Sequence, residues 1–120
     1  MSARLAETIE HFWTERDQFS VDSAPPELKQ AIEQCLAGLE SGQMRVAEPE
    51  SEAVEGAEES RWQVNEWLKK AVLLFFKTSA NQVIKGSPVH YLDKVPLQFA
   101  DEQAAAEAHC RLVPGCLIRR

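Results

Sequence analysis

The sequence lacks any apolar run long enough to span a lipid bilayer. Its longest uninterrupted apolar stretch is AVLLFF at residues 71–76, far short of the roughly 18 residues that a membrane helix needs. The first ten residues alternate charged and small side chains and lack the apolar centre of a signal peptide. We therefore expect a cytoplasmic protein with no membrane partner.

Cysteine is also scarce, and the three thiols of Cys35, Cys110 and Cys116 are an odd number. In a cytosolic chain, so few cysteines are most simply reduced thiols and not a disulfide framework. Cys110, which follows His109, and Cys116 could belong to a metal site. However, no second pair at zinc-finger spacing completes it, so we expect no bound metal.

An excess of basic residues is missing as well, since the formal net charge is −6. Residues 48–59 contain six of the 19 acidic side chains and no basic one, which leaves 13 acidic and 13 basic residues elsewhere. Without a basic footprint, we expect no nucleic-acid partner. Residues 48–60 are predicted to be a mobile acidic hairpin loop, although attraction of a basic partner remains an alternative.

Motifs of catalysis are absent: there is no glycine-rich phosphate loop, nucleophile elbow, zinc-protease helix or CxxC pair. His11 and His90 have no nearby acid or nucleophile in the sequence, so a structural or surface role is favoured for both. Asp93 and Lys94 resemble a surface turn with a local ion pair more than a binding loop. The residues alone predict no catalytic side chain and no cofactor bound by this chain.

What is present is the composition of one soluble domain, with 120 residues, 44% hydrophobic and 27% charged. Residues 2–19 place apolar side chains on one helical stripe, and residues 26–39 do so again after Pro26, with Gly42 as the terminating residue. The stripes are Leu5, Ile9, Phe12 and Phe19, then Leu28, Ile32, Cys35, Leu36 and Leu39. Alternating segments at 44–48 and 61–65 predict a β-hairpin.

The stretch NEWLKKAVLLFF, residues 65–76, predicts a core helix that Asn65 caps. Leu73 falls among the charged positions, which suggests a contact on the outer face, whereas Lys69 and Lys70 are expected to be solvated. Turns and brief extended pieces should follow, then a short helix from Asp101 to about His109.

The last ten residues read as apolar strand material with nothing after it to pair with. Arg111 lies there, and a guanidinium on such a segment can bind a carboxylate through two parallel hydrogen bonds. On spacing alone, an ordinary surface arginine is the favoured interpretation.

Five segments, in this order and spacing, resemble the N-terminal domain of tetrahydrodipicolinate N-succinyltransferase, and the resemblance runs from about residue 3 to the end. They are SGQMRVAE (41–48), WLKKAVLL (67–74), NQVIKG (81–86), YLDKVPLQFAD (91–101) and RLVPG (111–115). The resemblance implies transfer of a succinyl group from succinyl-CoA to tetrahydrodipicolinate, in diaminopimelate and lysine biosynthesis. It also implies a homotrimer built on a left-handed parallel β-helix, with Arg111 contacting a substrate carboxylate.

The implied fold class is α+β: a mostly helical small domain with a β-hairpin, capping a β-helix that is absent from this chain. We expect residues 1–110 to be the cap domain and residues 111–120 the start of the junction, and we expect the isolated chain to be inactive. Cys110 and Gly115 depart from the Phe and second Pro usual in the family. The rival hypothesis is a non-enzymatic interaction module derived from that domain.

Overall fold

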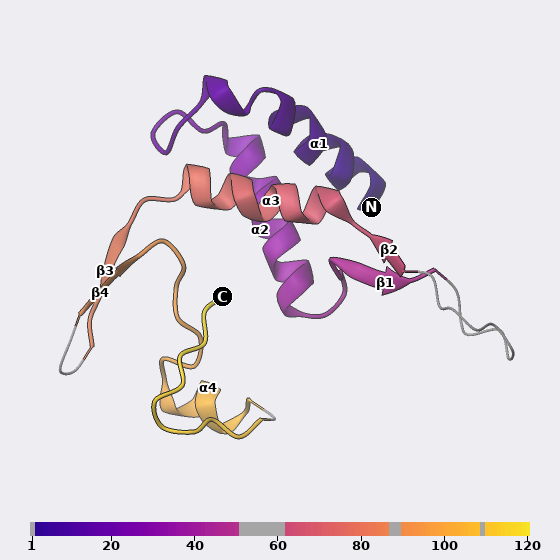
Figure 1. The fold of residues 1–120 in the computed structure, drawn as a ribbon. Helices are drawn as coiled ribbons and strands as arrows, with labels where there is room; N and C mark the ends of the chain where they lie inside the picture. Colours follow the sequence, from indigo (N-terminus) through magenta and orange to yellow (C-terminus); the bar gives the residue numbers. More distant parts are fainter. Residues whose placement is uncertain (1, 51–61, 87–89, 109) are drawn as a thin grey trace, which may run out of the picture. The chain divides into compact units, whose positions relative to one another are not determined.

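The computed structural model describes residues 2–50, 62–86, 90–108 and 110–120. Among them, helices predominate, and two short antiparallel hairpins complete an α+β fold (Figure 1). In chain order the elements are α1 (Ser2–Thr14), η1 (Arg16–Gln18), α2 (Pro26–Glu40), β1 (Ala47–Pro49), β2 (Trp62–Val64), α3 (Glu66–Thr78), β3 (Gln82–Ile84), β4 (Tyr91–Asp93) and α4 (Glu102–Ala106). No helix in the described part is long and apolar enough to cross a membrane. The chain separates into two packing units, residues 1–79 and 80–120.

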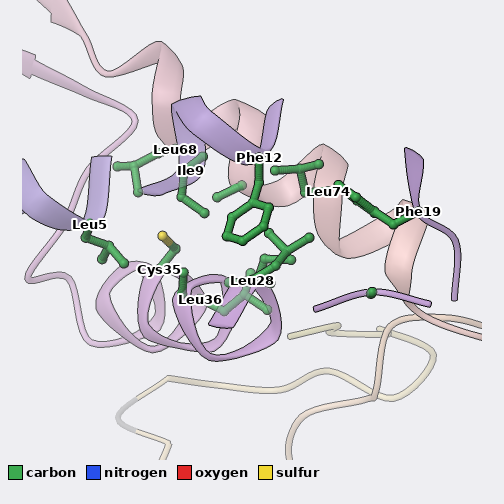
Figure 2. Close-up of a cluster of buried hydrophobic side chains, with 13 residues drawn as sticks. Leu5, Ile9, Phe12, Phe19, Leu28, Cys35, Leu36, Leu68 and Leu74 are labelled. Atoms are coloured by element: carbon green, nitrogen blue, oxygen red, sulfur yellow. The ribbon is translucent and has the colours of Figure 1, made fainter. Parts of the chain in front are cut away.

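Helices α1, α2 and α3 pack against one another in pairs and enclose the core of residues 1–79 (Figure 2). The predicted stripes supply this core. Its buried members are Leu5, Ile9, Phe12, Phe19, Ala24, Leu28, Ala31, Ile32, Cys35, Leu36, Leu68, Ala71 and Leu74. Full burial of one leucine or isoleucine contributes about 1.5–3 kcal/mol, so the three helices depend on their shared interface for stability.

The first helix ends earlier than predicted, at Thr14 instead of near Phe19, and a single 3₁₀ turn follows it. The Thr14 hydroxyl donates to the carbonyl oxygen of His11 at 2.7 Å, a local bond of the kind that competes with helix continuation. The backbone of Phe19 is extended, but its side chain is still buried in the core. There its ring lies edge-on to the ring of Phe12, with 6.3 Å between the ring centroids.

The second helix begins with Pro26 at its first position and ends before Gly42, as predicted. Gly42 has φ = 72°, and its amide donates to the carbonyl oxygen of Leu39 at 3.2 Å. Nothing lies within 4 Å of where its Cβ would be, so the backbone conformation alone explains this glycine.

The first predicted hairpin exists, but β1 starts at Ala47 and not at Met44. Ala47 pairs with Val64 and Pro49 with Trp62, and every residue of both strands is exposed. The hairpin therefore has no buried face to extend its pairing. The predicted mobile loop at 48–60 falls mostly on residues 51–61, which lie outside the described residues.

Helix α3 follows the predicted amphipathic pattern, with Leu68, Ala71 and Leu74 buried and Leu73 45% exposed. Asn65 occupies the N-cap position, but its side chain does not cap the helix. Its amide nitrogen instead donates to the carbonyl oxygen of Arg45 at 2.8 Å and to Oε1 of Glu48 at 3.0 Å. Asn65 thus ties the first hairpin to the start of α3.

The prediction that Lys70 is merely solvated is wrong. Its amine lies 2.7 Å from both carboxylate oxygens of Glu10, and its side chain is only 25% exposed. The two residues belong to α3 and α1, so this ion pair links the outer parts of two packed helices. Lys69, the neighbouring position, is exposed as predicted.

In residues 80–120, the brief extended pieces pair as a second hairpin, which the sequence reading did not anticipate. β3 and β4 are antiparallel, with Gln82 opposite Asp93 and Val83 opposite Leu92. Asp101 caps α4 as predicted, because its Oδ1 accepts a 2.8 Å bond from the amide of Ala104. The helix ends at Ala106, earlier than the expected end near residue 109.

Candidate functional site

Arg111 lies on the irregular segment that follows α4, and its side chain is exposed. No described residue forms an ion pair or hydrogen bond with its guanidinium, so the donors of this group face solvent. A planar guanidinium in this state can bind a carboxylate through two parallel hydrogen bonds. That role of Arg111 stays a prediction.

A tight turn at Val113–Cys116 comes directly after Arg111. The amide of Cys116 donates to the carbonyl oxygen of Val113 at 3.0 Å, and Gly115 has φ = 92°. Proline cannot adopt this φ, because its ring fixes the angle near −65°. The Gly115 that departs from the resembled family therefore gives this chain a local turn that a proline would forbid.

Beyond the turn, the chain returns to the segment before α4. Gln98 donates from its backbone amide to the carbonyl oxygen of Ile118, and Arg120 donates likewise to Pro96, both at 2.9 Å. Leu97 and Arg119 form an antiparallel bridge between these bonds. The expectation that this strand material is unpaired is therefore wrong for residues 118–120, because their partner precedes them in the chain.

Asp93, at the end of β4, joins the same arrangement. Its Oδ1 accepts from the backbone amide of Lys94 at 2.8 Å, and its Oδ2 lies 3.1 Å from the Arg119 guanidinium. The hydrogen bond from the Lys94 amide lowers the pKa of the Asp93 carboxyl below its usual value, and the bond from Arg119 lowers it further. The ion pair predicted inside the Asp93–Lys94 turn is thus made with a distant residue.

These contacts border two hollows of residues 80–120. The larger, about 660 Å³, is bounded by the second hairpin, residues 93–100 and residues 116–118. The smaller, about 290 Å³, lies between residues 98–99 and the turn at 112–116. Arg111 lines neither hollow, although it directly precedes Leu112, the first residue of the segment that lines the smaller one.

The other candidate side chains are those of His11, His90 and the three cysteines. His11 of α1 is exposed, and its Nε2 lies 3.6 Å from Oε2 of Glu15, the residue that follows this helix. His90 accepts a 3.1 Å bond from the amide of Gly86. Cys35 is fully buried in the three-helix core, whereas Cys110 and Cys116 are exposed. No group of three or more potential metal ligands occurs among the described residues.

The family model described as "Tetrahydrodipicolinate N-succinyltransferase N-terminal" matches residues 4–78. The chain belongs to this family. The matched range coincides closely with the unit of residues 1–79, so it covers helices α1, α2 and α3.

Individual relatives extend the similarity through the second unit. The chain is 44% identical over 119 residues to the 2,3,4,5-tetrahydropyridine-2,6-dicarboxylate N-succinyltransferase of Alkalilimnicola ehrlichii, which covers 97% of this chain and 40% of that protein. It is 42% identical over 122 residues to the protein of the same name from Methylobacterium sp. strain 4-46, covering 98% and 41%. The protein of that name from Leptothrix cholodnii is 38% identical over 122 residues, covering 100% and 42%. The chain thus spans about two fifths of the length of these relatives.

Within this member of the N-succinyltransferase family, the sequence reading missed the pairing of Asp93 with Arg119. The two residues are 26 positions apart, so no local spacing reveals that they meet. The one available signal is opposite charge at the end of each of two short extended segments. Arg111, by contrast, was identified because the resembled motif places an arginine there.

Proposed function

We propose that this chain is the N-terminal part of an enzyme that transfers a succinyl group from succinyl-CoA to tetrahydrodipicolinate, within diaminopimelate and lysine biosynthesis. The observation that supports it most strongly is the 44% identity over 97% of the chain to a protein bearing that N-succinyltransferase name. The complete protein would add a left-handed parallel β-helix, assemble as a homotrimer and work in the cytoplasm.

The proposed reaction is a direct acyl transfer. The amino nitrogen of the ring-opened acceptor attacks the thioester carbonyl carbon of succinyl-CoA, so that a C–N bond forms as the C–S bond breaks. Coenzyme A leaves as the thiol, and the proton lost from nitrogen balances it. Neither a covalent enzyme intermediate nor a metal ion is required, and the main task of the protein is to hold the two substrates together.

In this proposal the described chain contributes one substrate-binding group, Arg111, and no catalytic residue. Its exposed guanidinium, without a partner among the described residues, suits one carboxylate of a dicarboxylic acid. The acceptor amine, the thioester and the trimer contacts would be handled by the β-helix. The isolated 120-residue chain should therefore show no succinyltransferase activity.

Release of coenzyme A thiol, followed with a thiol-reactive dye, tests the proposal. The product of the complete reading frame should release the thiol only when both succinyl-CoA and tetrahydrodipicolinate are present, and the 120-residue chain should not. Arg111→Ala in the complete protein should raise the KM for the dicarboxylate about ten- to a hundredfold, the loss typical of one charged hydrogen-bonding group. Arg45→Ala, which removes another exposed arginine, should leave it unchanged.

Two outcomes would reject the proposal. Absence of acyl transfer by the complete product would exclude the enzyme, and turnover by the 120-residue chain would exclude the assigned division of labour. If the reading frame contains no hexapeptide repeats after Arg120, the interaction module derived from this domain becomes the working hypothesis.

A further inference from the structure

Residues 118–120 pair with residues 96–98 through backbone hydrogen bonds over a short stretch of chain. Two hydrogen bonds of 2.9 Å flank the Leu97–Arg119 bridge, and no longer ladder continues from them among the described residues. Such a short antiparallel contact is marginal by itself, because stable pairing needs more strands or a buried face. Another interaction is therefore needed to hold this segment in place.

The ion pair of Asp93 and Arg119 supplies that interaction at the same point. The Arg119 guanidinium lies 3.1 Å from Oδ2, while Oδ1 accepts from the Lys94 amide, so both oxygens of Asp93 are occupied. An aspartate carboxyl is ionised at neutral pH, and the Lys94 amide and Arg119 lower the pKa of this one further. Asp93 is itself fixed by its place in β4, opposite Gln82.

The paired segments close a loop that contains Arg111. It runs from residue 99 to residue 117, through the Asp101-capped helix α4 and the Gly115 turn. Closing such a loop removes conformational freedom from everything inside it. An exposed arginine in a closed loop samples fewer positions, and this lowers the entropy lost when it binds a ligand.

We propose that the Asp93–Arg119 pair is a positioning clamp that closes the loop carrying Arg111. Asp93 and Arg119 do not touch the substrate. They act by holding residues 118–120 against residues 96–98. That the clamp serves binding of a dicarboxylate rests on the proposed function, whereas the closure of the loop does not.

Limited digestion of the 120-residue chain with trypsin tests the closure directly. Trypsin cuts after Arg111, and mass spectrometry of the cleaved chain gives the rate at that bond. Asp93→Asn and Arg119→Met should each speed this cleavage about two- to fivefold, the range expected for loss of an exposed ion pair. Arg119→Lys, which keeps the charge but loses the planar fork, should give an intermediate rate.

The double variant and a matched control make the result specific. Asp93→Asn with Arg119→Met should cleave no faster than the single variants, because either change alone opens the clamp. Glu102→Gln removes another exposed acid from the same unit and should cleave at the wild-type rate. Circular dichroism identifies any variant that fails to fold. If Arg119→Met does not fold, Asp93→Asn alone tests the clamp. Its amide oxygen can still accept the hydrogen bond from the Lys94 amide, so only the ion pair is removed.

The clamp would be overturned by unchanged cleavage in both single variants. It would also be overturned by a double variant whose acceleration is the product of the two single accelerations.

In the complete protein, Arg119→Met should raise the KM for the dicarboxylate about two- to fivefold and leave the KM for succinyl-CoA unchanged. In a protein that already carries Arg111→Ala, Arg119→Met should not raise the KM for the dicarboxylate any further. A uniform loss for both substrates would show a structural role only. If the complete protein lacks acyl transfer, the proposed function fails and the digestion still decides on the clamp.

Discussion

At the scale of single residues, Cys35 lies in the core of residues 1–79, among the apolar side chains of three helices (Figure 2). Cys110 and Cys116 are exposed on the segment around Arg111. Water that would stabilise a thiolate cannot reach Cys35, and desolvation raises the pKa of its thiol from 9.0 to about 11. Burial thus makes Cys35 a small apolar core residue and leaves the other two thiols available to reagents.

The raised pKa of Cys35 predicts a specific loss of stability in alkali. Between pH 9 and 11 the thiol of the unfolded chain loses its proton while the folded one keeps it, so unfolding is favoured as the pH rises. The free energy of unfolding should fall by up to about 1.4 kcal/mol per pH unit more than in Cys35→Ala. Urea titrations of both proteins across this range measure the difference. Equal slopes would show that the folded thiol titrates normally.

At the scale of elements, α3 presents two unlike faces to its surroundings. Leu68 is 1% exposed and contacts the core, whereas Leu73 on the same helix is 45% exposed. Both are leucines, so a comparison of their replacements separates the effect of burial from that of helix propensity.

Leu68→Ala should lower the free energy of unfolding by about 2–5 kcal/mol, because it leaves a cavity between three packed helices. Leu73→Ala should change it by less than about 1 kcal/mol. Urea unfolding followed by circular dichroism gives both values. Similar losses for the two variants would mean that the outer face of α3 is also packed in solution.

Helices α1, α2 and α3 could be predicted from the sequence because each one buries a stripe with the 3.6-residue period. This period predicts the burial of Leu5, Ile9, Leu28 and Leu68. The second hairpin, with three residues per strand, carries no periodic pattern of burial. Val83 and Leu92 face each other at 67% exposure each, so no alternation of buried and exposed residues revealed their pairing.

Only the part of the candidate site that lies in a recognisable sequence motif could be predicted from the sequence. Arg111 was assigned a binding role through the resemblance of its segment to a family motif, whereas its spacing alone favoured an ordinary surface arginine. Residues 118–120 pair with residues 96–98 only because the chain between them, which includes α4, folds back. The sequence of neither segment predicts that the two will pair. This is why the pairing of Arg119 with Asp93 emerged only from the structure.

At the scale of the whole molecule, stability is unevenly divided between the two units. All members of the buried core cluster lie between Leu5 and Leu74, in the unit of residues 1–79. Among the described residues of 80–120, Val95 is the one buried apolar side chain. The second unit therefore depends on short backbone pairings and the Asp93–Arg119 ion pair.

Residues 1–79 should consequently fold as an independent domain, and residues 80–120 should not. A protein of residues 1–79 should unfold cooperatively in urea, with a midpoint close to that of the first transition of the full chain, because it retains the entire three-helix core. A peptide of residues 80–120 should show a gradual change without a transition, since a lone hairpin is at best marginally stable in water. Leu68→Ala within residues 1–79 should lower its midpoint as it does in the full chain, which ties the transition to the core. A non-cooperative 1–79 protein would instead show that the second unit contributes stability that its own few buried side chains do not reveal.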